Sequence, residues 1–234
     1  MKVDIWSDIR CPFCYIGKRK FEKALSTFPQ RNKVEVIWHS FELDPTAKTD
    51  TTKDVYTYLA EIKGQSREWS VQMHDNIKQT AYEVGLTYNF DKAVIANSFN
   101  AHRLIHMAKE AGKGDAAKEA LLKAYFTDGK NIDDTETLAV IGASIGLDKQ
   151  AVSNMLASKK YTKEVRADED KAREYGINGV PFFVLNDKYG ISGAQSPETF
   201  SSALQQAWAE YEAAHPTLVM TETDGDVCDV NGNC

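Results

Sequence analysis

Residues 7–25, SDIRCPFCYIGKRKFEKAL, decide how this chain is interpreted. The segment before them, KVDIW (2–6), alternates apolar and polar residues in the manner of a strand. From Cys11 to about Phe28 the apolar residues recur at helical spacing, and Pro29 ends the pattern. Cys11 and Cys14 therefore lie where a strand is followed by a helix. Such a pair is a redox dithiol, half of a metal site or two buried thiols.

The start of the helix favours redox chemistry. Free backbone N–H groups and the helix dipole stabilise a negative charge at Cys11, so we expect a lowered pKa for its thiol. Arg10 adds positive potential, and Asp8 opposes it. Pro12 suits the first helical position because its missing N–H would have no partner. Cys14 lies on the same helical face, close enough to resolve a mixed disulfide formed at Cys11.

The two alternatives fit the rest of the chain less well. A zinc site would need further ligands, and the other cysteines, Cys228 and Cys234, do not have zinc-ligand spacing. Two inert thiols are poorly placed at a strand-to-helix junction. His102 and His106 have a spacing that metal sites use, but a helix face at a domain interface is the simpler interpretation. We therefore predict a dithiol/disulfide site and no metal.

The composition is that of an ordinary globular protein. Of 234 residues, 42% are hydrophobic and 26% charged, and the net charge of −6 gives no reason to expect nucleic acid as a partner. No apolar stretch approaches the roughly 20 residues that span a bilayer. MKVDIWSD (1–8) lacks the apolar core of a secretory signal, so we expect a cytoplasmic protein or a mature chain with a start Met. Four cysteines are too few for a disulfide scaffold.

The strand and helix patterns divide the chain into three parts. Strands are expected at 34–41 and 180–186, and a closing helix at 197–214. Residues 52–175 are helical almost throughout, and 91–112 and 148–176 each read as one helix. Asp134 and Asp148 are candidate N-caps. We predict one α/β domain, residues 1–50 plus 176–214, with a helical domain, 51–175, inserted into it. Residues 215–234 form a flexible tail.

Val180-Pro181 opens the returning strand in GINGVPFFVL (176–185). Proline cannot donate a hydrogen bond to a sheet, so it belongs at the first residue or at an edge. A proline at such a corner is a candidate for a cis peptide bond, and an ordinary trans edge proline is the alternative.

Together, these features resemble the thioredoxin superfamily, and the long helical block resembles its DsbA branch. The segments VIWHSFELDP, NSFNAHRLIHMAKEAG and GINGVPFFVLNDKYGISGAQSPETF are similar to FrnE-type proteins. These are DsbA-family dithiol oxidoreductases related to 2-hydroxychromene-2-carboxylate isomerases. The resemblance covers roughly residues 2–213. It implies an α/β fold, a thioredoxin fold with a large all-helical insertion.

The resemblance also implies roles for residues at the site. Cys11 would be the exposed attacking thiol and Cys14 the resolving thiol. Pro181 would be a cis proline facing the disulfide, and Val180 would offer its backbone to a substrate. Phe13 stands where relatives often have Trp, so the reduction potential cannot be carried over.

Further substrate contacts are expected beside these residues. Pro12 and Phe13 lie between the cysteines. Asn97, His102 and Arg103 lie in a segment, NSFNAHRL, that by the resemblance faces the active-site groove. Related glutathione transferases and isomerases use a serine-type site, and the intact CPFC (11–14) argues against that chemistry.

The predicted function is thiol-disulfide exchange, as a disulfide reductase, isomerase or oxidase, with a role in oxidative-stress defence. No metal or nucleotide cofactor is needed. Protein or small-molecule disulfides exchange electrons with thiols such as glutathione or a dithiol reductant. Neither a nucleic acid nor a membrane is expected as a partner. The chain is a monomer or a homodimer.

Two other functions stay open. One is a glutathione-dependent isomerase or transferase of a small aromatic compound. The other is a chaperone-like binding module with incidental thiols.

The chain ends in CDVNGNC (228–234), in which Cys228 and Cys234 can close a local disulfide. This pair is a candidate auxiliary redox pair that exchanges with Cys11–Cys14. Incidental oxidation of two exposed thiols is the equal alternative.

Overall fold

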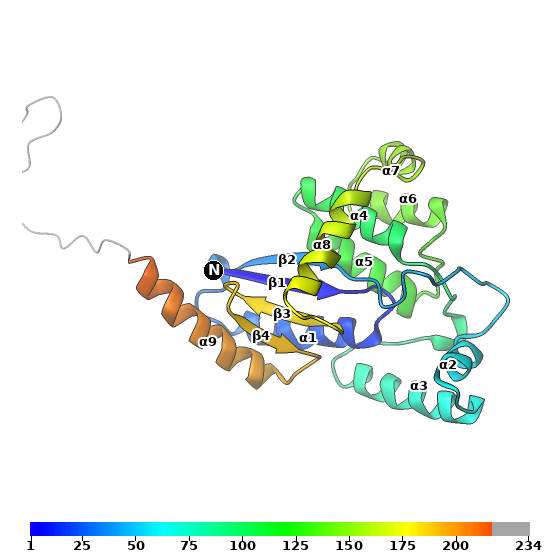
Figure 1. Cartoon of the computed structure of the whole chain (residues 1–234), viewed down its shortest axis with the longest axis horizontal. Helices are drawn as coiled ribbons and strands as arrows, with labels where there is room; N and C mark the ends of the chain where they lie inside the picture. Colours follow the sequence, from blue (N-terminus) through cyan, green and yellow to red (C-terminus); the bar gives the residue numbers. More distant parts are fainter. Residues whose placement is uncertain (217–234) are drawn as a thin grey trace, which may run out of the picture.

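Four strands form one mixed sheet within residues 1–216, the part of the chain that this computed structural model describes (Figure 1). Strand β1 (Lys2–Ser7) pairs in parallel with β2 (Glu35–Ser40) and antiparallel with β3 (Phe182–Leu185). Strand β3 pairs antiparallel with β4 (Tyr189–Ser192). The strand order β2-β1-β3-β4 places β1 inside the sheet, where both of its faces are covered.

The residues of β1 alternate between two cores. Val3 and Ile5 face the main hydrophobic cluster, whereas Trp6 faces a smaller cluster on the opposite side. Asp4 is 1% exposed, and its carboxylate hydrogen-bonds to His39 on β2 at 2.6 Å. The alternation in KVDIW thus marks a strand whose polar position also has a buried partner.

Helix α1 (Pro12–Ser26) has the start that the sequence predicts. Cys11 is its N-cap residue, and Pro12 occupies the first turn. The helix packs beside α9 (Pro197–Ala214) against the sheet. Phe21 of α1 lies 5.5 Å from Phe183 of β3 and 5.6 Å from Phe200 of α9, between ring centroids. This aromatic contact fixes α1, and with it the cysteines, on the sheet.

Seven helices make up the insertion in the described chain. In the view of Figure 1, the last five of them lie above the sheet and the first two lie at the lower right. Their bounds are α2 (Val55–Lys63), α3 (Arg67–Tyr82), α4 (Phe99–Glu110), α5 (Gly114–Phe126), α6 (Thr135–Ser144), α7 (Lys149–Leu156) and α8 (Thr162–Glu174). Asp134 and Asp148 are confirmed as N-caps, since each side chain accepts a hydrogen bond from a backbone N–H of its helix.

Two segments expected as single helices are not. In 91–112, the α-helix begins only at Phe99, whose N–H donates to the Asn97 side chain at 2.8 Å. Before it, Ile95 forms a β-bridge with Asp50. The apolar residues of this segment are buried by an irregular connection, which periodicity alone does not separate from a helix.

The segment 148–176 breaks into α7 and α8. Tyr161 at the break has φ 64°, in the left-handed region. Arg103 of α4 donates to the carbonyls of Met155 (2.7 Å) and Ser158 (2.6 Å) at the end of α7. A long-range partner for these carbonyls replaces the bonds that a continuous helix would make.

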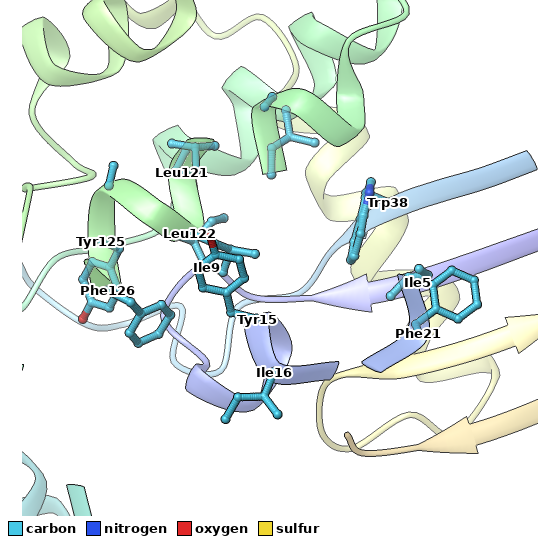
Figure 2. Close-up of a cluster of buried hydrophobic side chains, with 14 of the residues drawn as sticks. Ile5, Ile9, Tyr15, Ile16, Phe21, Trp38, Leu121, Leu122, Tyr125 and Phe126 are labelled. Carbon is cyan, nitrogen blue, oxygen red and sulfur yellow. The ribbon is translucent and has the colours of Figure 1, made fainter. Parts of the chain in front are cut away.

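The insertion and the sheet share one hydrophobic core. Figure 2 shows Leu122 of α5 beside Ile9 and Tyr15, which come from the first 15 residues, and the four-residue cluster they form with Leu121 belongs to the main core. Residues 51 and 175 therefore mark where the helical insertion begins and ends along the chain. In space, the insertion and the sheet pack together through one core. No helix within residues 1–216 is both long and apolar enough to cross a membrane.

Candidate functional site

The two cysteines lie at the start of α1 as free thiols. Cys11 is 4% exposed and Cys14 is 1% exposed, so the expectation that Cys11 is an exposed thiol is wrong for this structure. The Cys11 thiol donates to the carbonyl of Val180 at 3.3 Å, and the Val180–Pro181 peptide is cis. The structure thus confirms the cis bond and brings residues 11 and 180, far apart in the chain, into contact.

Two further contacts hold this arrangement. The hydroxyl of Tyr88 donates to the Pro12 carbonyl at 2.7 Å, so the insertion supports the turn between the cysteines. Gly17 lies against Pro181, and a Cβ at position 17 would come within 2.9 Å of the proline ring. Glycine therefore lets α1 approach the cis proline closely.

The thiols are hydrogen-bonded to each other and share the charge of the reduced pair unequally. The hydrogen bond to Cys14 and burial raise the pKa of Cys11. Burial also raises the pKa of Cys14, but the hydrogen bond from Cys11, the charge of Lys118 and the Ser7 hydroxyl outweigh it and lower that pKa. We expected a lowered pKa for Cys11 from its helix position. The structure corrects this, because a buried cation lowers the pKa of Cys14, whereas no cation is among the main influences on Cys11.

That cation is Lys118 of α5. Its side chain is fully buried, and Nζ donates to the Ser7 carbonyl at 3.0 Å. Burial lowers the pKa of Lys118 to about 8, although the charges of Cys14 and Asp8 act in the opposite direction. Sequence analysis missed this residue. Its position in the apolar stripe of AAKEALLKAYF, one turn before Leu121 and Leu122, was the available signal.

Asp8 and His102 form a second buried pair beneath the site. Asp8 accepts hydrogen bonds from the N–H groups of Leu43 (2.9 Å) and Arg10 (3.2 Å), and His102 Nε2 lies 3.4 Å away. Burial alone would raise the pKa of Asp8, but His102 and these N–H groups lower it to about 2. Burial lowers the pKa of His102. His102 is 0% exposed, so the structure does not place it in contact with a substrate.

The structure also places Asn97 and Arg103 away from the cysteines. Asn97 donates to the Ala47 carbonyl at 3.0 Å and caps the start of α4. Arg103 binds the carbonyls at the end of α7. Their polar groups are occupied by backbone partners, so the expectation of substrate contacts gains no support here. Cys228 and Cys234 lie outside the described residues.

A pocket of about 590 Å³ opens beside Cys11, between the start of α1 and helices α2 and α3. Pro12 and Phe13 line it, and Phe13 is 42% exposed. The insertion supplies mostly apolar walls, including Leu59, Ile62, Ile77, Phe90, Ile95 and Phe126. The volume is typical of sites that hold small molecules. Within residues 1–216, no cluster of His, Cys, Asp and Glu is arranged to hold a metal ion.

Known proteins share this architecture. A probable DsbA oxidoreductase from Streptomyces coelicolor, SCO1869, is 41% identical, with a TM-score of 0.85 over 100% of this chain and 98% of that chain. The uncharacterized protein YwbO of Bacillus subtilis strain 168 is 29% identical over 205 residues, 86% of this chain and 94% of its own length. The cytosolic disulfide reductase DsbM from Pseudomonas aeruginosa has the same fold, with 16% identity and a TM-score of 0.65 over 90% of this chain and 100% of that chain.

The DSBA-like thioredoxin domain matches residues 2–205. This range includes the cysteine pair, the whole helical insertion, the cis proline and the first half of α9. A thioredoxin domain of this type has a mixed sheet and a helical insertion, and the structure contains both. The chain therefore belongs to the family of DSBA-like thioredoxin domain proteins.

Proposed function

We propose that the protein catalyses thiol-disulfide exchange at Cys11 and Cys14, and that within its family it is of the FrnE type. The observation that carries the proposal is the position of Cys11. Cys11 is the N-cap residue of α1, its sulfur contacts the carbonyl before the cis proline, and the residue lines a pocket that Cys14 does not line. This arrangement gives one sulfur to the substrate and keeps the other for resolution.

Reduction of a disulfide R–S–S–R′ proceeds in two displacements. As Cys11 attacks one sulfur, its proton passes to Cys14, whose pKa is the lower of the two, and R′–S⁻ leaves. Cys14 then attacks the Cys11 sulfur, the Cys11–Cys14 disulfide forms, and R–S⁻ leaves. The dithiol supplies both electrons, and a thiol such as glutathione or a dithiol reductant restores it. Oxidation of a substrate dithiol is the reverse sequence.

Lys118 assists Cys14 in both directions. Before the second displacement Cys14 must lose its proton in a site closed to water, and the Lys118 amine is the base available there. In the reverse direction Cys14 leaves as a thiolate, and the ammonium form of Lys118 stabilises that charge. Because burial brings its pKa to about 8, Lys118 exchanges a proton near neutral pH.

The partners in this proposal are low-molecular-weight thiols and the disulfides of small molecules or proteins. In a cytoplasm that keeps thiols reduced, the net reaction is reduction or isomerisation.

The test is a glutathione titration of the Cys11–Cys14 pair, with mass spectrometry of the Cys14→Ser variant. We expect a single two-electron transition, and a mixed disulfide trapped on Cys11 of the variant. A potential near that of thioredoxin, about −270 mV, assigns a reductase, and one near that of DsbA, about −120 mV, assigns an oxidant. Without any transition the proposal fails. An activity that requires glutathione but survives Cys11→Ser would instead identify an isomerase or a transferase.

A further inference from the structure

Arg10 lines the pocket beside Cys11, and two nitrogens of its guanidinium group have no hydrogen-bond acceptor within residues 1–216. One nitrogen of the Arg10 guanidinium, Nη2, donates to the Tyr58 hydroxyl at 3.2 Å. The other two, Nε and Nη1, are buried and have no hydrogen-bond partner within residues 1–216. Arginine has five N–H donors, and leaving buried donors unpaired is costly. The side chain therefore has two nitrogens left for an acceptor at the edge of the pocket.

The other polar groups of the pocket leave Arg10 charged. The Tyr125 hydroxyl lies near the guanidinium but is neutral, and Asp44 acts on Arg10 only through its charge. Asp44 is directed to Thr46, from which it accepts two hydrogen bonds, and it lies near solvent. His74 is bonded to the Ser70 carbonyl, and burial lowers its pKa, so it carries no charge at neutral pH. Lys63, at the end of α2, adds a second positive charge to the wall. The charge that fits this pocket is negative.

Asp8, the nearest buried carboxylate, is also already occupied. Its oxygens accept from the backbone N–H groups of Leu43 and Arg10 and face His102, so they do not pair with the Arg10 guanidinium. Arg10 thus remains a positively charged fork at the edge of an apolar space that Cys11 also lines. A planar carboxylate is the anion that such a fork binds most specifically.

We propose that the pocket binds small aromatic or aliphatic disulfides and thiols that carry a carboxylate, with Arg10 as the residue that selects the charge. The inference rests on the proposed function, because the bound sulfur must react with Cys11. The apolar body contacts walls such as Phe90 and Phe126, and the carboxylate pairs with Arg10. For a disulfide Ar–S–S–Ar, the reduced protein supplies two electrons, two Ar–S⁻ are released, and the Cys11–Cys14 disulfide forms.

Two chromogenic disulfides test the charge directly. 5,5′-Dithiobis(2-nitrobenzoate) carries a carboxylate on each ring, and bis(4-nitrophenyl) disulfide is its counterpart without one. The measurement is the stopped-flow rate constant of reduced protein with each. We expect Arg10→Met to lower the ratio of the two constants about tenfold or more, and Arg10→Lys to restore part of it. Using the ratio removes any change in the reactivity of Cys11, since that change affects both disulfides equally.

Arg67→Met is the matched control. Arg67 also stacks over a tyrosine, with its guanidinium 5.5 Å from the Tyr56 ring, but its side chain is 54% exposed and does not line the pocket. We expect no change in the ratio. An unchanged ratio in Arg10→Met would overturn the inference and leave the proposed function intact. So would an equal loss toward a denatured protein disulfide, since the pocket would then bind a peptide.

A binding measurement separates the two proposals. Calorimetry of the carboxylate disulfide with the Cys11→Ser/Cys14→Ser protein requires no exchange. We expect binding that is weakened about tenfold or more by Arg10→Met. If the wild-type protein reacts with neither disulfide, the proposed function fails, and this titration alone decides whether the pocket binds the anion. Equal binding with and without the Arg10→Met substitution would refute the inference.

Discussion

Two buried lysines near Trp38 have opposite environments. Lys18 of α1 is 1% exposed and Lys118 of α5 is 0% exposed, and their Nζ atoms lie 6.0 Å and 5.5 Å from the Trp38 ring. Lys18 is surrounded by three carboxylates, those of Glu22, Asp115 and Glu119. Lys118 donates a hydrogen bond to the Ser7 carbonyl and interacts with the charge of the Cys11–Cys14 pair.

The difference shows that burial alone does not decide what a lysine does. Burial lowers the pKa of Lys18, but Asp115, Glu22 and Glu119 outweigh it, so the net shift is upward. Lys18 is a permanent cation that ties α1 to the insertion. For Lys118 burial dominates and the pKa is about 8. One lysine is structural, and the other is placed to exchange a proton with Cys14.

The largest expected difference between the lysines is kinetic. In Lys118→Met, resolution of the mixed disulfide between Cys11 and glutathione should slow about 10- to 100-fold, because Cys14 loses its proton acceptor. Quenched-flow mass spectrometry would show the mixed disulfide accumulating. Lys18→Met removes a lysine of similar burial without touching the thiols, and its resolution rate should stay near that of the wild type. Equal slowing in both variants would show that Lys118 acts only through packing.

Stability should change in opposite directions in the same two variants. Lys18→Met leaves three carboxylates without their cation, and we expect the free energy of unfolding to fall by about 1–3 kcal/mol. Lys118→Met removes a buried charge that no carboxylate pairs with, so we expect it to rise by about 1–3 kcal/mol at pH 7. Urea unfolding of the oxidised proteins measures both. Destabilisation by Lys118→Met would contradict the comparison.

The pH dependence of stability provides a smaller and more specific difference. Between pH 8, near the folded pKa of Lys118, and its ordinary value of 10.5, the unfolded chain keeps a proton that the folded chain has lost. Stability must therefore rise with pH across this window, by at most about 1.4 kcal/mol per pH unit. Comparing Cys11→Ser/Cys14→Ser with the same protein carrying Lys118→Met removes thiol titration. The rise should be present in the first and absent in the second.

The smallest effect is expected from removal of residues 217–234. The described contacts of the Cys11–Cys14 pair come from residues 1–216. If these contacts set the reduction potential, the truncation leaves it unchanged. A glutathione titration of the truncated chain checks this. An altered potential would show that the tail contacts the site. A slower exchange at unchanged potential would support Cys228 and Cys234 as an auxiliary pair.

The local parts of the site could be predicted from the sequence alone. The strand KVDIW, the helix start at CPFC and the strand after Val180-Pro181 depend on periodicity and on turn residues, which short windows contain. Errors occurred where a long-range contact overrides the local pattern. Arg103 ends α7 from another helix, so the apolar stripe of 148–176 did not continue as one helix.

What the sequence by itself determined is the thioredoxin-type order of elements, the two cysteines and the proline that faces them. The tertiary structure alone decided the electrostatics around them. Lys118 binds the carbonyl of Ser7 across 111 residues, and Tyr58 holds Arg10 across 48. Periodicity shows which residues share a helix face, but a pKa or an unpaired guanidinium depends on what packs against that face. For this reason Cys11 and Cys14 were predictable, and Lys118 and Arg10 were not.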